Sequence, residues 1–242
     1  MTDLISRTAL VTGASRGIGR ATARALALAG ARVIVHYGNS AEDAHSLVAE
    51  IREAGGQADA VGADLSASDG AQRLAAEVRK LVGQLDILVA NAGIAVPATI
   101  EAQTIEDFDR MFAVNVRAPF FLVQQLLPML GDGSSIVMTS SLAARAAVGQ
   151  LSAYSATKGA IDTMVKHFAS LLGPRGIRVN AVRPGLIDTD IHAAGGEPGR
   201  IERLKGSVPL QRGGTPEEVA EAILWLASEQ SSYCTGTFID VS

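Results

Sequence analysis

A tyrosine and a lysine stand four residues apart in the stretch Y-S-A-T-K, from Tyr154 to Lys158. Residues with this spacing lie on one face of a helix, with about 5–6 Å between their Cβ atoms. A lysine ammonium at that distance favours the phenolate and so lowers the pKa of the tyrosine hydroxyl. Such a hydroxyl would donate a proton near neutral pH. An ordinary helix with one aromatic and one solvated lysine has the same spacing, so the pair alone does not assign a function.

A glycine-rich turn, V-T-G-A-S-R-G-I-G over residues 11–19, carries a second pattern with chemical meaning. Gly13, Gly17 and Gly19 have the spacing G-x-x-x-G-x-G. Glycines let a backbone turn sharply and approach a pyrophosphate, which then lies at a helix N-terminus with free N–H groups. The turn predicts a dinucleotide site, with a ligand-free connection between strand and helix as the alternative.

Two further turns fit the same ligand. Asp64 ends the run 57–63, where its carboxylate would accept a hydrogen bond from an adenine amino group. The tripeptide N-A-G, residues 91–93, follows the apolar run 86–90, and its small side chains would let a ligand lie against the backbone. Each turn alone is equally well explained as an unrelated connection. Together they place turn chemistry after three neighbouring strands, where open α/β sheets bind ligands.

The elements that must position these residues alternate along the chain. Short Val/Ile/Leu-rich runs are typical of strands buried on both faces, and their alternation with helices predicts a parallel sheet. We expect an α/β fold over residues 1–242, with a seven-stranded parallel doubly wound sheet and helices on both faces. Strands are expected at 8–12, 31–37, 57–63, 86–90, 134–140, 177–182 and 237–241. Helices are expected from the glycine turn to 29, at 41–54, 68–82 and 105–130, around 154–158, and at 216–227.

Two segments near the end of the chain have their own signals. Thr215, Pro216 and Glu218 form a T-x-x-E capping box that predicts the start of the last helix. Residues 188–214 are rich in Gly and Pro and follow the C-terminal end of a strand. We therefore expect a mobile substrate lid there, with a plain connecting loop as the alternative.

The composition argues against several classes of partner. The 242-residue chain has a net charge of −4, so it lacks the basic surplus that binds nucleic acid. The four histidines are scattered and Cys234 is the single cysteine, so we expect no metal site and a reducing, cytoplasmic location. No run approaches 18 apolar residues and the N-terminus lacks a signal-peptide pattern, so we expect no membrane association.

Taken together, the motifs resemble the classical short-chain dehydrogenase/reductase family. The stretches 12–19, 91–93, 154–158 and 182–185 (V-R-P-G) occur in the family's order with Asn115 and Ser141, and Ser141 lies thirteen residues before Tyr154. The resemblance covers residues 6–240 and includes members of the 3-oxoacyl-acyl-carrier-protein reductase type. It implies a single Rossmann domain, hydride transfer between a nicotinamide and a carbonyl or secondary-alcohol carbon, and a homotetramer or homodimer. Relatives commonly end with a Gly-Gly pair and a few more residues, so we expect altered contacts where this chain ends at V-S.

The resemblance also implies a role for each catalytic residue. Tyr154 would protonate the developing alkoxide, and Lys158 would lower the pKa of Tyr154 and bind the nicotinamide ribose. Ser141 would hydrogen-bond the carbonyl oxygen and orient it. Asn115 would hold a water that links Lys158 to solvent. Ser140 is the neighbouring alternative to Ser141, but the spacing to Tyr154 favours Ser141.

The resemblance and the end of the second strand predict NADP(H) as the preferred cofactor, with NAD(H) as the alternative. Tyr37 stands where NAD-preferring relatives carry an acidic residue that would repel a 2′-phosphate. Arg16 matches phosphate geometry, although a solvated surface charge is the other interpretation, and His36, Asn39 and Ser40 could add donors. The residues expected to bind the cofactor are Gly13, Ser15, Arg16, Gly17, Ile18, Gly19, His36, Tyr37, Asn39, Ser40, Asp64, Leu65, Asn91, Ala92, Gly93, Tyr154, Lys158, Pro184, Gly185, Ile187 and Thr189.

The substrate stays open at this level. A carrier protein is acidic and needs basic docking residues, but residues 130–135 have none and Arg175 alone could serve. Sugar, polyol, steroid and small-ketone oxidoreduction are the alternatives, including an NAD-dependent dehydrogenase. A non-catalytic NADP(H)-binding regulator is disfavoured, because it would have no use for a serine, tyrosine and lysine in this pattern. The residues expected to line the substrate pocket are Ser141, Leu142, Arg145, Gln150, Leu151, Tyr154, Leu186 and His192.

Overall fold

The computed structural model describes residues 3–190 and 196–242, and its centre is one parallel sheet. The sheet has seven strands in the order β3-β2-β1-β4-β5-β6-β7, and every neighbouring pair is parallel. This confirms the predicted seven-stranded parallel sheet. The strand order reverses between β1 and β4, which is where open α/β sheets form a ligand-binding crevice. The strands are β1 (Thr8–Val11), β2 (Arg32–Tyr37), β3 (Gln57–Gly62), β4 (Ile87–Ala90), β5 (Ser135–Thr139), β6 (Arg178–Pro184) and β7 (Phe238–Val241).

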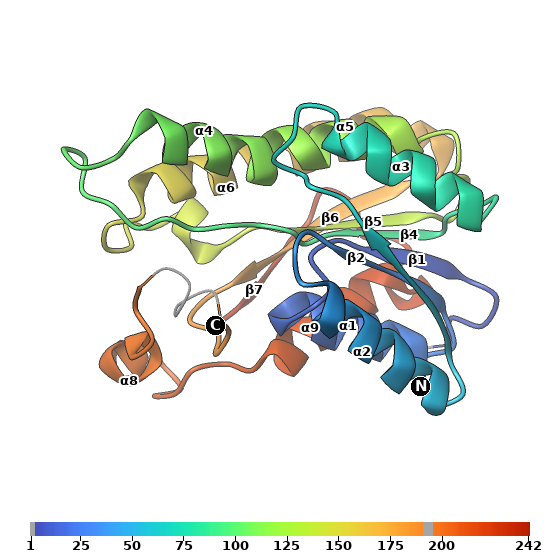
Figure 1. The fold of residues 1–242 in the computed structure, drawn as a ribbon, viewed down its shortest axis with the longest axis horizontal. Coiled ribbons are helices and arrows are strands. Elements are labelled where there is room, and N and C mark those ends of the chain that lie inside the picture. Colours follow the sequence, from blue (N-terminus) through green and yellow to red (C-terminus); the bar gives the residue numbers. More distant parts are fainter. Residues whose placement is uncertain (1–2, 191–195) are drawn as a thin grey trace.

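Helices cover both faces of the sheet (Figure 1). The layer above the sheet in that view contains α3 (Gly70–Leu81), α4 (Ile105–Phe112), α5 (Ala118–Leu126) and α6 (Ser152–Leu172). The layer below contains α1 (Gly17–Leu28), α2 (Ala41–Glu53) and α9 (Pro216–Ala227), and the short α8 (Arg200–Leu204) lies to one side. Every helix within residues 3–190 and 196–242 is too short or too polar to cross a membrane.

The two layers are held by side chains that alternate along each strand. Leu10, Ile34, Leu88 and Ile136 are completely buried in a cluster with α3, α5 and α6. Their neighbours along the same strands join a second cluster with α1, α2 and α9, namely Ala9, Val11, Val33, Val35, Ile87, Val89 and Val137. Each buried Val, Leu or Ile side chain stabilises the fold by about 1.5–3 kcal/mol. The alternation explains why the strands are apolar throughout, since successive side chains enter opposite clusters.

The single helix predicted over residues 105–130 is wrong in two places. α4 ends at Phe112 and is followed by a π-helical segment, η1 (Ala113–Arg117), in which the N–H of Ala118 bonds the carbonyl of Ala113 five residues earlier. Pro119 has no N–H for the α-helical bond to residue 115, which accounts for the change of pattern. α5 then ends at Leu126, two residues before Pro128; Leu127 still has the α conformation, but Pro128 has no N–H to continue the α-helical hydrogen bonds.

The start of α9 agrees with the prediction. The Thr215 hydroxyl accepts from the N–H of Glu218, and the Glu218 carboxylate accepts from the N–H of Thr215. Within the predicted lid, 188–214, the structure places α8 and a 3₁₀ turn, η4 (Lys205–Ser207). The N–H of Asp188 donates to the carbonyl of Gly214 at 2.9 Å, so the two ends of this segment meet. His192 lies outside the described residues.

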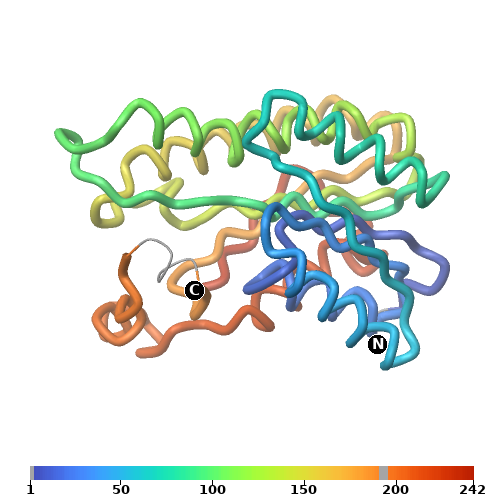
Figure 2. The backbone as a smooth tube through the Cα atoms, viewed as in Figure 1, coloured from blue at the N-terminus to red at the C-terminus, as the bar shows by residue number. Residues whose placement is uncertain are grey.

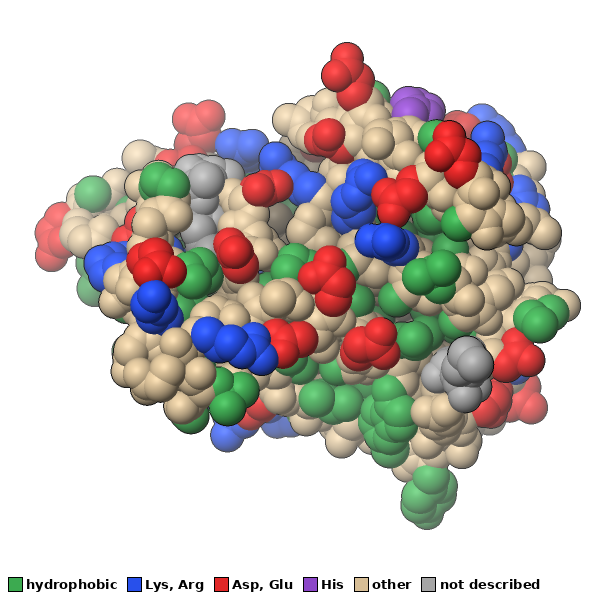
Figure 3. All heavy atoms as spheres, turned by 90° about the horizontal axis from the view of Figure 1, so that it is seen from below, with side chains coloured by type: hydrophobic (Ala, Val, Ile, Leu, Met, Phe, Trp, Pro, Cys, Tyr) green, Lys and Arg blue, Asp and Glu red, His purple; other side chains and the backbone are tan. Residues whose placement is uncertain are grey.

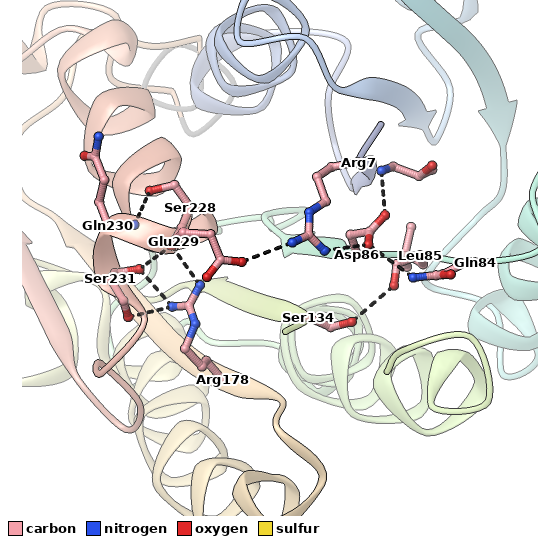
Figure 4. A network of polar contacts seen from close by, with 11 residues as sticks. Arg7, Gln84, Leu85, Asp86, Ser134, Arg178, Ser228, Glu229, Gln230 and Ser231 are labelled. Atoms are coloured by element: carbon pink, nitrogen blue, oxygen red, sulfur yellow. Dashed lines mark hydrogen bonds and ion pairs between the residues drawn. The ribbon is translucent and has the colours of Figure 1, made fainter. Parts of the chain in front are cut away.

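The amino ends of the strands carry a network of polar contacts (Figure 4). Arg7 lies between Asp86 and Glu229, at 3.0 Å from a carboxylate oxygen of each. Arg178 donates to the carbonyl oxygens of residues 226, 228 and 231 and to the hydroxyl of Ser231. The second oxygen of Asp86 accepts the N–H of Thr8 at 2.8 Å. These contacts fasten β1, β4 and β6 to the segment after α9.

Two further features are the charge distribution on one face of the molecule and the packing of the C-terminal end of the chain. On the face seen from below, basic and acidic side chains are intermingled (Figure 3). The backbone trace shows the C-terminal end of the chain beside the segment that follows β6 (Figure 2). A Cβ added to Gly185 would lie 2.6 Å from the Cβ of Ser242, so the last residue packs directly on the turn after β6.

Candidate active site

The glycine turn after β1 has the backbone that its sequence predicts. Gly13 and Gly17 have φ values of +63° and +54°, which L-residues with side chains rarely adopt. A Cβ on Gly13 would lie 2.9 Å from the Cα of Ala92, and one on Gly19 only 2.2 Å from the carbonyl oxygen of Gly13. The three glycines therefore allow both the turn itself and its close contact with the N-A-G tripeptide.

The start of α1 fits a phosphate group. Arg16 is the N-cap residue, its side chain makes no capping hydrogen bond, and the first turn of α1 carries no acidic residue. The first N–H groups of the helix therefore lack a capping side chain and lie at the positive end of the helix dipole. The Arg16 side chain is exposed and has no hydrogen bond or ion pair within the described part of the chain. Ser15 is buried and Ile18 half-buried beside it.

His36 does not face the ligand side, which corrects the prediction that it donates to a phosphate. Its side chain is 2% exposed. Its Nδ1 accepts from the N–H of Gly13 at 3.1 Å and its Nε2 lies 3.0 Å from the carbonyl oxygen of Ala63. Burial lowers the pKa of His36 to about 4, so the ring is neutral at pH 7. His36 thus braces the glycine turn against the end of β3.

Asn91 also serves the turn rather than facing outward. Its side-chain amide donates to the carbonyls of Thr12 and Gly13 at 3.0 and 3.3 Å, and its oxygen accepts from the Thr139 hydroxyl. The Thr12 hydroxyl accepts the N–H groups of Asn91 and Ala92 at 2.9 and 3.0 Å. The prediction had not assigned a role to either threonine. In the sequence, a threonine that links two turns through its hydroxyl looks the same as any other threonine at the end of a strand.

β2 ends at Tyr37, so an aromatic side chain and not an acidic one stands at the end of this strand. The Tyr37 ring packs on Gly62, where an added Cβ would lie 2.9 Å from ring atoms. Asn39 is exposed and Ser40 half-buried after it. The exposed Asp64 accepts from the N–H and hydroxyl of Ser66 at 2.8 and 2.6 Å, and these bonds lower its pKa. The side chain of the next residue, Leu65, belongs to the core, so only its backbone faces the edge.

Ser141, Tyr154 and Lys158 come together at the carboxyl end of β5, as predicted. Ser141 caps η2 (Leu142–Ala144), where its hydroxyl accepts from the N–H of Ala143 at 3.1 Å, and its side chain lies close enough to the Tyr154 hydroxyl on α6 to lower the pKa of that tyrosine. The Lys158 amine lies 5.5 Å from the centroid of the Tyr154 ring and donates to the carbonyl of Thr139 at 2.7 Å. Ser140, the neighbouring alternative, points away from this group, since its hydroxyl donates to Asp162.

The pKa of Tyr154 differs from the prediction. Burial raises it to about 12, and the neighbouring Ser141 side chain opposes that rise. The Lys158 amine donates to the Thr139 carbonyl, and its charge does not offset the rise that burial causes in the pKa of Tyr154. Burial lowers the pKa of Lys158 itself to about 8, against a raising effect of Asp162. At pH 7 the tyrosine is therefore protonated and most of the lysine is charged.

Asn115 lies inside the π-helical segment η1 and is 2% exposed. Its amide nitrogen donates to the carbonyl of Ile94 and to the Thr157 hydroxyl, and its oxygen accepts the N–H of Ile94. A Cβ on Gly93 would lie 3.4 Å from the Asn115 oxygen and 3.6 Å from the Lys158 amine. Gly93 thus leaves the backbone open between these two side chains. π-Helical turns are frequent at functional sites.

The turn after β6 closes the site on the side opposite β4. Pro184 is buried, and the Ile187 side chain is 4% exposed within the core, so only the Ile187 backbone faces the site. The Thr189 side chain lies 3.5 Å from the point that a Cβ on Gly17 would occupy. The segment that follows β6 and the glycine turn are therefore in direct contact.

The predicted substrate residues differ in where the structure places them. The Leu142 side chain lies 3.2 Å from the point that a Cβ on Gly185 would occupy. Leu151 and Leu186 are half-buried; Leu151 directly precedes α6, and Leu186 follows β6. Arg145 is held in an ion pair with Asp240 at 2.8 Å. Gln150 is exposed, and its carbonyl accepts the N–H of Ala98.

Comparisons with known proteins agree with this geometry. Residues 13–242 match the family model described as enoyl-(acyl carrier protein) reductase. The chain is 43% identical over 241 residues to the oxidoreductase YgfF of Escherichia coli K12, covering 97% of this chain and 98% of that protein. It is 38% identical over 250 residues to versicolorin reductase stcU of Emericella nidulans, covering 98% and 95%. The crystal structure of landomycin C-6 ketoreductase LanV with bound NADP and rabelomycin is similar, with a TM-score of 0.90 and 39% identity over 99% of this chain and 96% of that one.

Proposed function

The chain belongs to the short-chain dehydrogenase/reductase family, and on that premise we propose that it reduces a ketone with NADPH. The observation that carries the proposal is the grouping of Ser141 beside the Tyr154 hydroxyl, with the Lys158 amine 5.5 Å from the Tyr154 ring centroid. NADPH, when bound, supplies a hydride to the carbonyl carbon. The glycine turn, the residues 91–93 and the turn after β6 are the segments that would hold it.

The chain's own residues account for the proton and the orientation of the substrate. The hydroxyls of Ser141 and Tyr154 would both contact the carbonyl oxygen, and Ser141 would stabilise the negative charge that develops there. Tyr154, protonated at neutral pH, would donate its proton to that oxygen. The Lys158 ammonium would stabilise the phenolate that remains, because an opposite charge nearby favours the ionised form. Asn115, across Gly93 from Lys158, would support the return of the proton through water.

The preference for NADPH over NADH is part of the proposal. An exposed guanidinium at Arg16 and the absence of an acidic residue at Tyr37 support it. Arginine pairs well with a phosphate, whereas a carboxylate at the end of β2 would repel one. NADP bound to the related ketoreductase LanV is consistent with this preference.

For the substrate we propose a neutral ketone on a ring system. Leu142, Leu151 and Leu186 would provide an apolar wall, and Arg145 is neutralised by Asp240. Two similar proteins are named as a reductase and a ketoreductase, namely versicolorin reductase and the ketoreductase LanV with bound rabelomycin. A carrier-bound substrate is less well supported, because the guanidinium of Arg175 is committed to the carbonyls of residues 127 and 130 at the end of α5.

We further propose that residues 188–214 cover the bound substrate and that the enzyme is a cytoplasmic homotetramer or homodimer. The joined ends of the segment at Asp188 and Gly214 support a hinged lid.

Phe108, Phe120 and Phe121 are 36–41% exposed on α4 and α5, beside a shallow groove of about 550 Å³. Apolar surface of this kind marks an interface, and sedimentation that gave only monomer would contradict the oligomer.

The first experiment is a titration of the purified protein with NADPH and with NADH, followed by nicotinamide fluorescence. We expect tighter binding of NADPH. NADPH oxidation is then measured with a panel of ring ketones, straight-chain ketones and a 3-oxoacyl thioester. Turnover of ring ketones supports the proposal. Binding without turnover of any carbonyl favours a regulatory NADP(H)-binding protein, and an NADH preference overturns the cofactor assignment.

A further inference from the structure

A largely buried ion pair continues the row of side chains on α6 that begins with Tyr154 and Lys158. Asp162 is one helical turn beyond Lys158, and it pairs with Arg183 of β6. The Arg183 Nη2 and Nε groups donate to one Asp162 oxygen at 2.7 and 3.1 Å. The two side chains are only 13% and 10% exposed. An ion pair that is taken out of water in this way needs further contacts to be favourable.

The second oxygen of Asp162 reaches the strand end that bears Ser141. The Ser140 hydroxyl donates to it at 2.7 Å, and Ser140 is 2% exposed. The same hydroxyl lies 3.3 Å from the carbonyl of Lys158. Because Ser140 directly precedes Ser141, one carboxylate connects the end of β5 to the helix that presents the tyrosine and the lysine.

Arg183 is itself fixed from the other side. Its guanidinium lies 3.8 Å from the centroid of the Phe238 ring, and its Nη1 lies 3.6 Å from an oxygen of Asp240 on β7. Cation–π contacts of this kind hold a guanidinium in place. The ion pair is therefore held between β5, β6, β7 and α6, and neither of its members can move without breaking contacts to several elements.

We propose that Asp162 is a positioning residue for the reaction: held by Arg183, its carboxylate fixes α6 against the end of β5 and so sets Tyr154 relative to Ser141. The inference rests on the proposed ketone reduction. Two hydroxyls that must contact one carbonyl oxygen tolerate little displacement, since a shift of about 1 Å can cost about 100-fold in rate. Asp162 also supplies negative charge close to Lys158.

The charge effect on Lys158 has a definite sign. The groups that act on the amine are Tyr154 and Asp162 from its own helix and the carbonyl of Thr139 from β5, and Gly93 lies between the amine and the side-chain oxygen of Asn115 on η1. Burial lowers the pKa of Lys158 to about 8, and Asp162 opposes this. Without the carboxylate the lysine would lose its proton at a lower pH, so the alkaline limb of the pH–rate profile would move toward neutral pH.

The test compares Asp162→Asn with Asp86→Asn. Asp86 is the acid of the Arg7 pair at the opposite edge of the sheet, with 8% of its side chain exposed, so the two substitutions are matched in burial and chemistry. Asparagine keeps an oxygen for Ser140 but removes the charge. We expect Asp162→Asn to lower kcat about 10- to 100-fold and to move the alkaline limb to lower pH, with NADPH binding unchanged. Asp86→Asn should leave kcat and the limb as in the wild type.

Two further variants guard against misfolding and separate the two effects. The double variant Asp162→Asn, Arg183→Met leaves no unpaired buried charge, and it should show the same fall in kcat. Ser140→Ala removes the contact with β5 but keeps the ion pair, so it should lower kcat while leaving the alkaline limb in place. A fall in kcat that Asp86→Asn reproduces would overturn the inference.

A readout without turnover separates this inference from the proposed function. The chain has four lysines, Lys80, Lys158, Lys166 and Lys205, so isotope-labelled lysine gives few NMR signals and Lys158→Arg assigns the relevant one. Its pKa should fall in Asp162→Asn and stay constant in Asp86→Asn. If the wild type reduces no ketone, the proposed function fails. An unchanged Lys158 pKa together with an unchanged Tyr154 environment in Asp162→Asn would overturn the inference itself.

Discussion

One arginine–aspartate pair lies at the amino ends of the strands (the amino edge) and another at their carboxyl ends (the carboxyl edge), but the two pairs end on different partners. At the amino edge, Asp86 binds Arg7 and the N–H of Thr8, so the contacts return to the strands themselves. At the carboxyl edge, Asp162 binds Arg183 and the hydroxyl beside Ser141. The first pair therefore stabilises the fold, whereas the second also places groups with a displaced pKa. A buried ion pair indicates function only through what its outer contacts hold.

The largest effect should come from removing one hydroxyl at the carboxyl edge. We expect Tyr154→Phe to lower kcat by about 10²–10⁴-fold, the range for loss of a general acid, while NADPH binding and the midpoint of unfolding change little. Tyr233→Phe is the matched control, because Tyr233 is fully exposed. Substantial turnover by Tyr154→Phe would remove the chemical distinction between the two edges.

The complementary change at the amino edge should affect stability alone. Asp86→Asn removes a charged acceptor of hydrogen bonds from Arg7 and Thr8, and loss of such bonds costs about 1.5–3 kcal/mol each at most. We expect a loss of about 2 kcal/mol in the free energy of unfolding on this basis, measured by urea denaturation, with kcat unchanged. A parallel loss of kcat would show that the two edges are coupled through the sheet.

His36 should make the carboxyl edge sensitive to acid. Its pKa is lowered from 6.5 to about 4 in the folded protein, so the unfolded chain binds more protons between these values and stability falls as the pH drops through that window. At about pH 5 the loss should be about 2 kcal/mol, from about 1.36 kcal/mol per pKa unit. Urea denaturation at pH 7 and pH 5 measures it. His36→Asn should abolish this pH dependence, whereas His45→Asn, at an exposed position, should retain it.

The smallest effect concerns cofactor choice at the start of α1. Arg16→Ala should weaken NADPH binding by about 10-fold, as expected for one charge-assisted phosphate contact of about 1.5 kcal/mol, and leave NADH binding unchanged. Arg24→Ala is the control, since Arg24 lies on the same helix and pairs with Glu50. Equal weakening of both nucleotides would assign Arg16 to a general role at the turn.

Local patterns in the sequence were sufficient for much of this architecture. The seven parallel strands follow from apolar runs that alternate with helices, and Ser141, Tyr154 and Lys158 meet because their spacing is fixed by one strand end and one helix. The capping box at Thr215 is decided within four residues. Such features depend on neighbours in the chain, so a single sequence reveals them.

Other features depend on contacts that the spacing does not reveal. His36 turns inward because of the pleat of β2, and only the folded backbone shows that its ring meets Gly13 and the end of β3. The helix over 105–130 breaks because Pro119 cannot donate the next α-helical bond, an effect that its apolar pattern conceals. Asp162 and Arg183 are 21 residues apart on different elements, so nothing local indicates that they pair.

The ion pair of Arg145 and Asp240 offers a way to redesign the pocket. It is exposed, with 58% and 39% of the side chains accessible, and it anchors the loop after Ser141 to β7 from outside. Exposed pairs of this kind contribute about 0–1 kcal/mol to stability, so the pair adds little to the stability of the fold, and residues 146–151 beside it can be varied in a library. Substrate preference can then be changed through residues 146–151 without replacing Tyr154, the proposed proton donor.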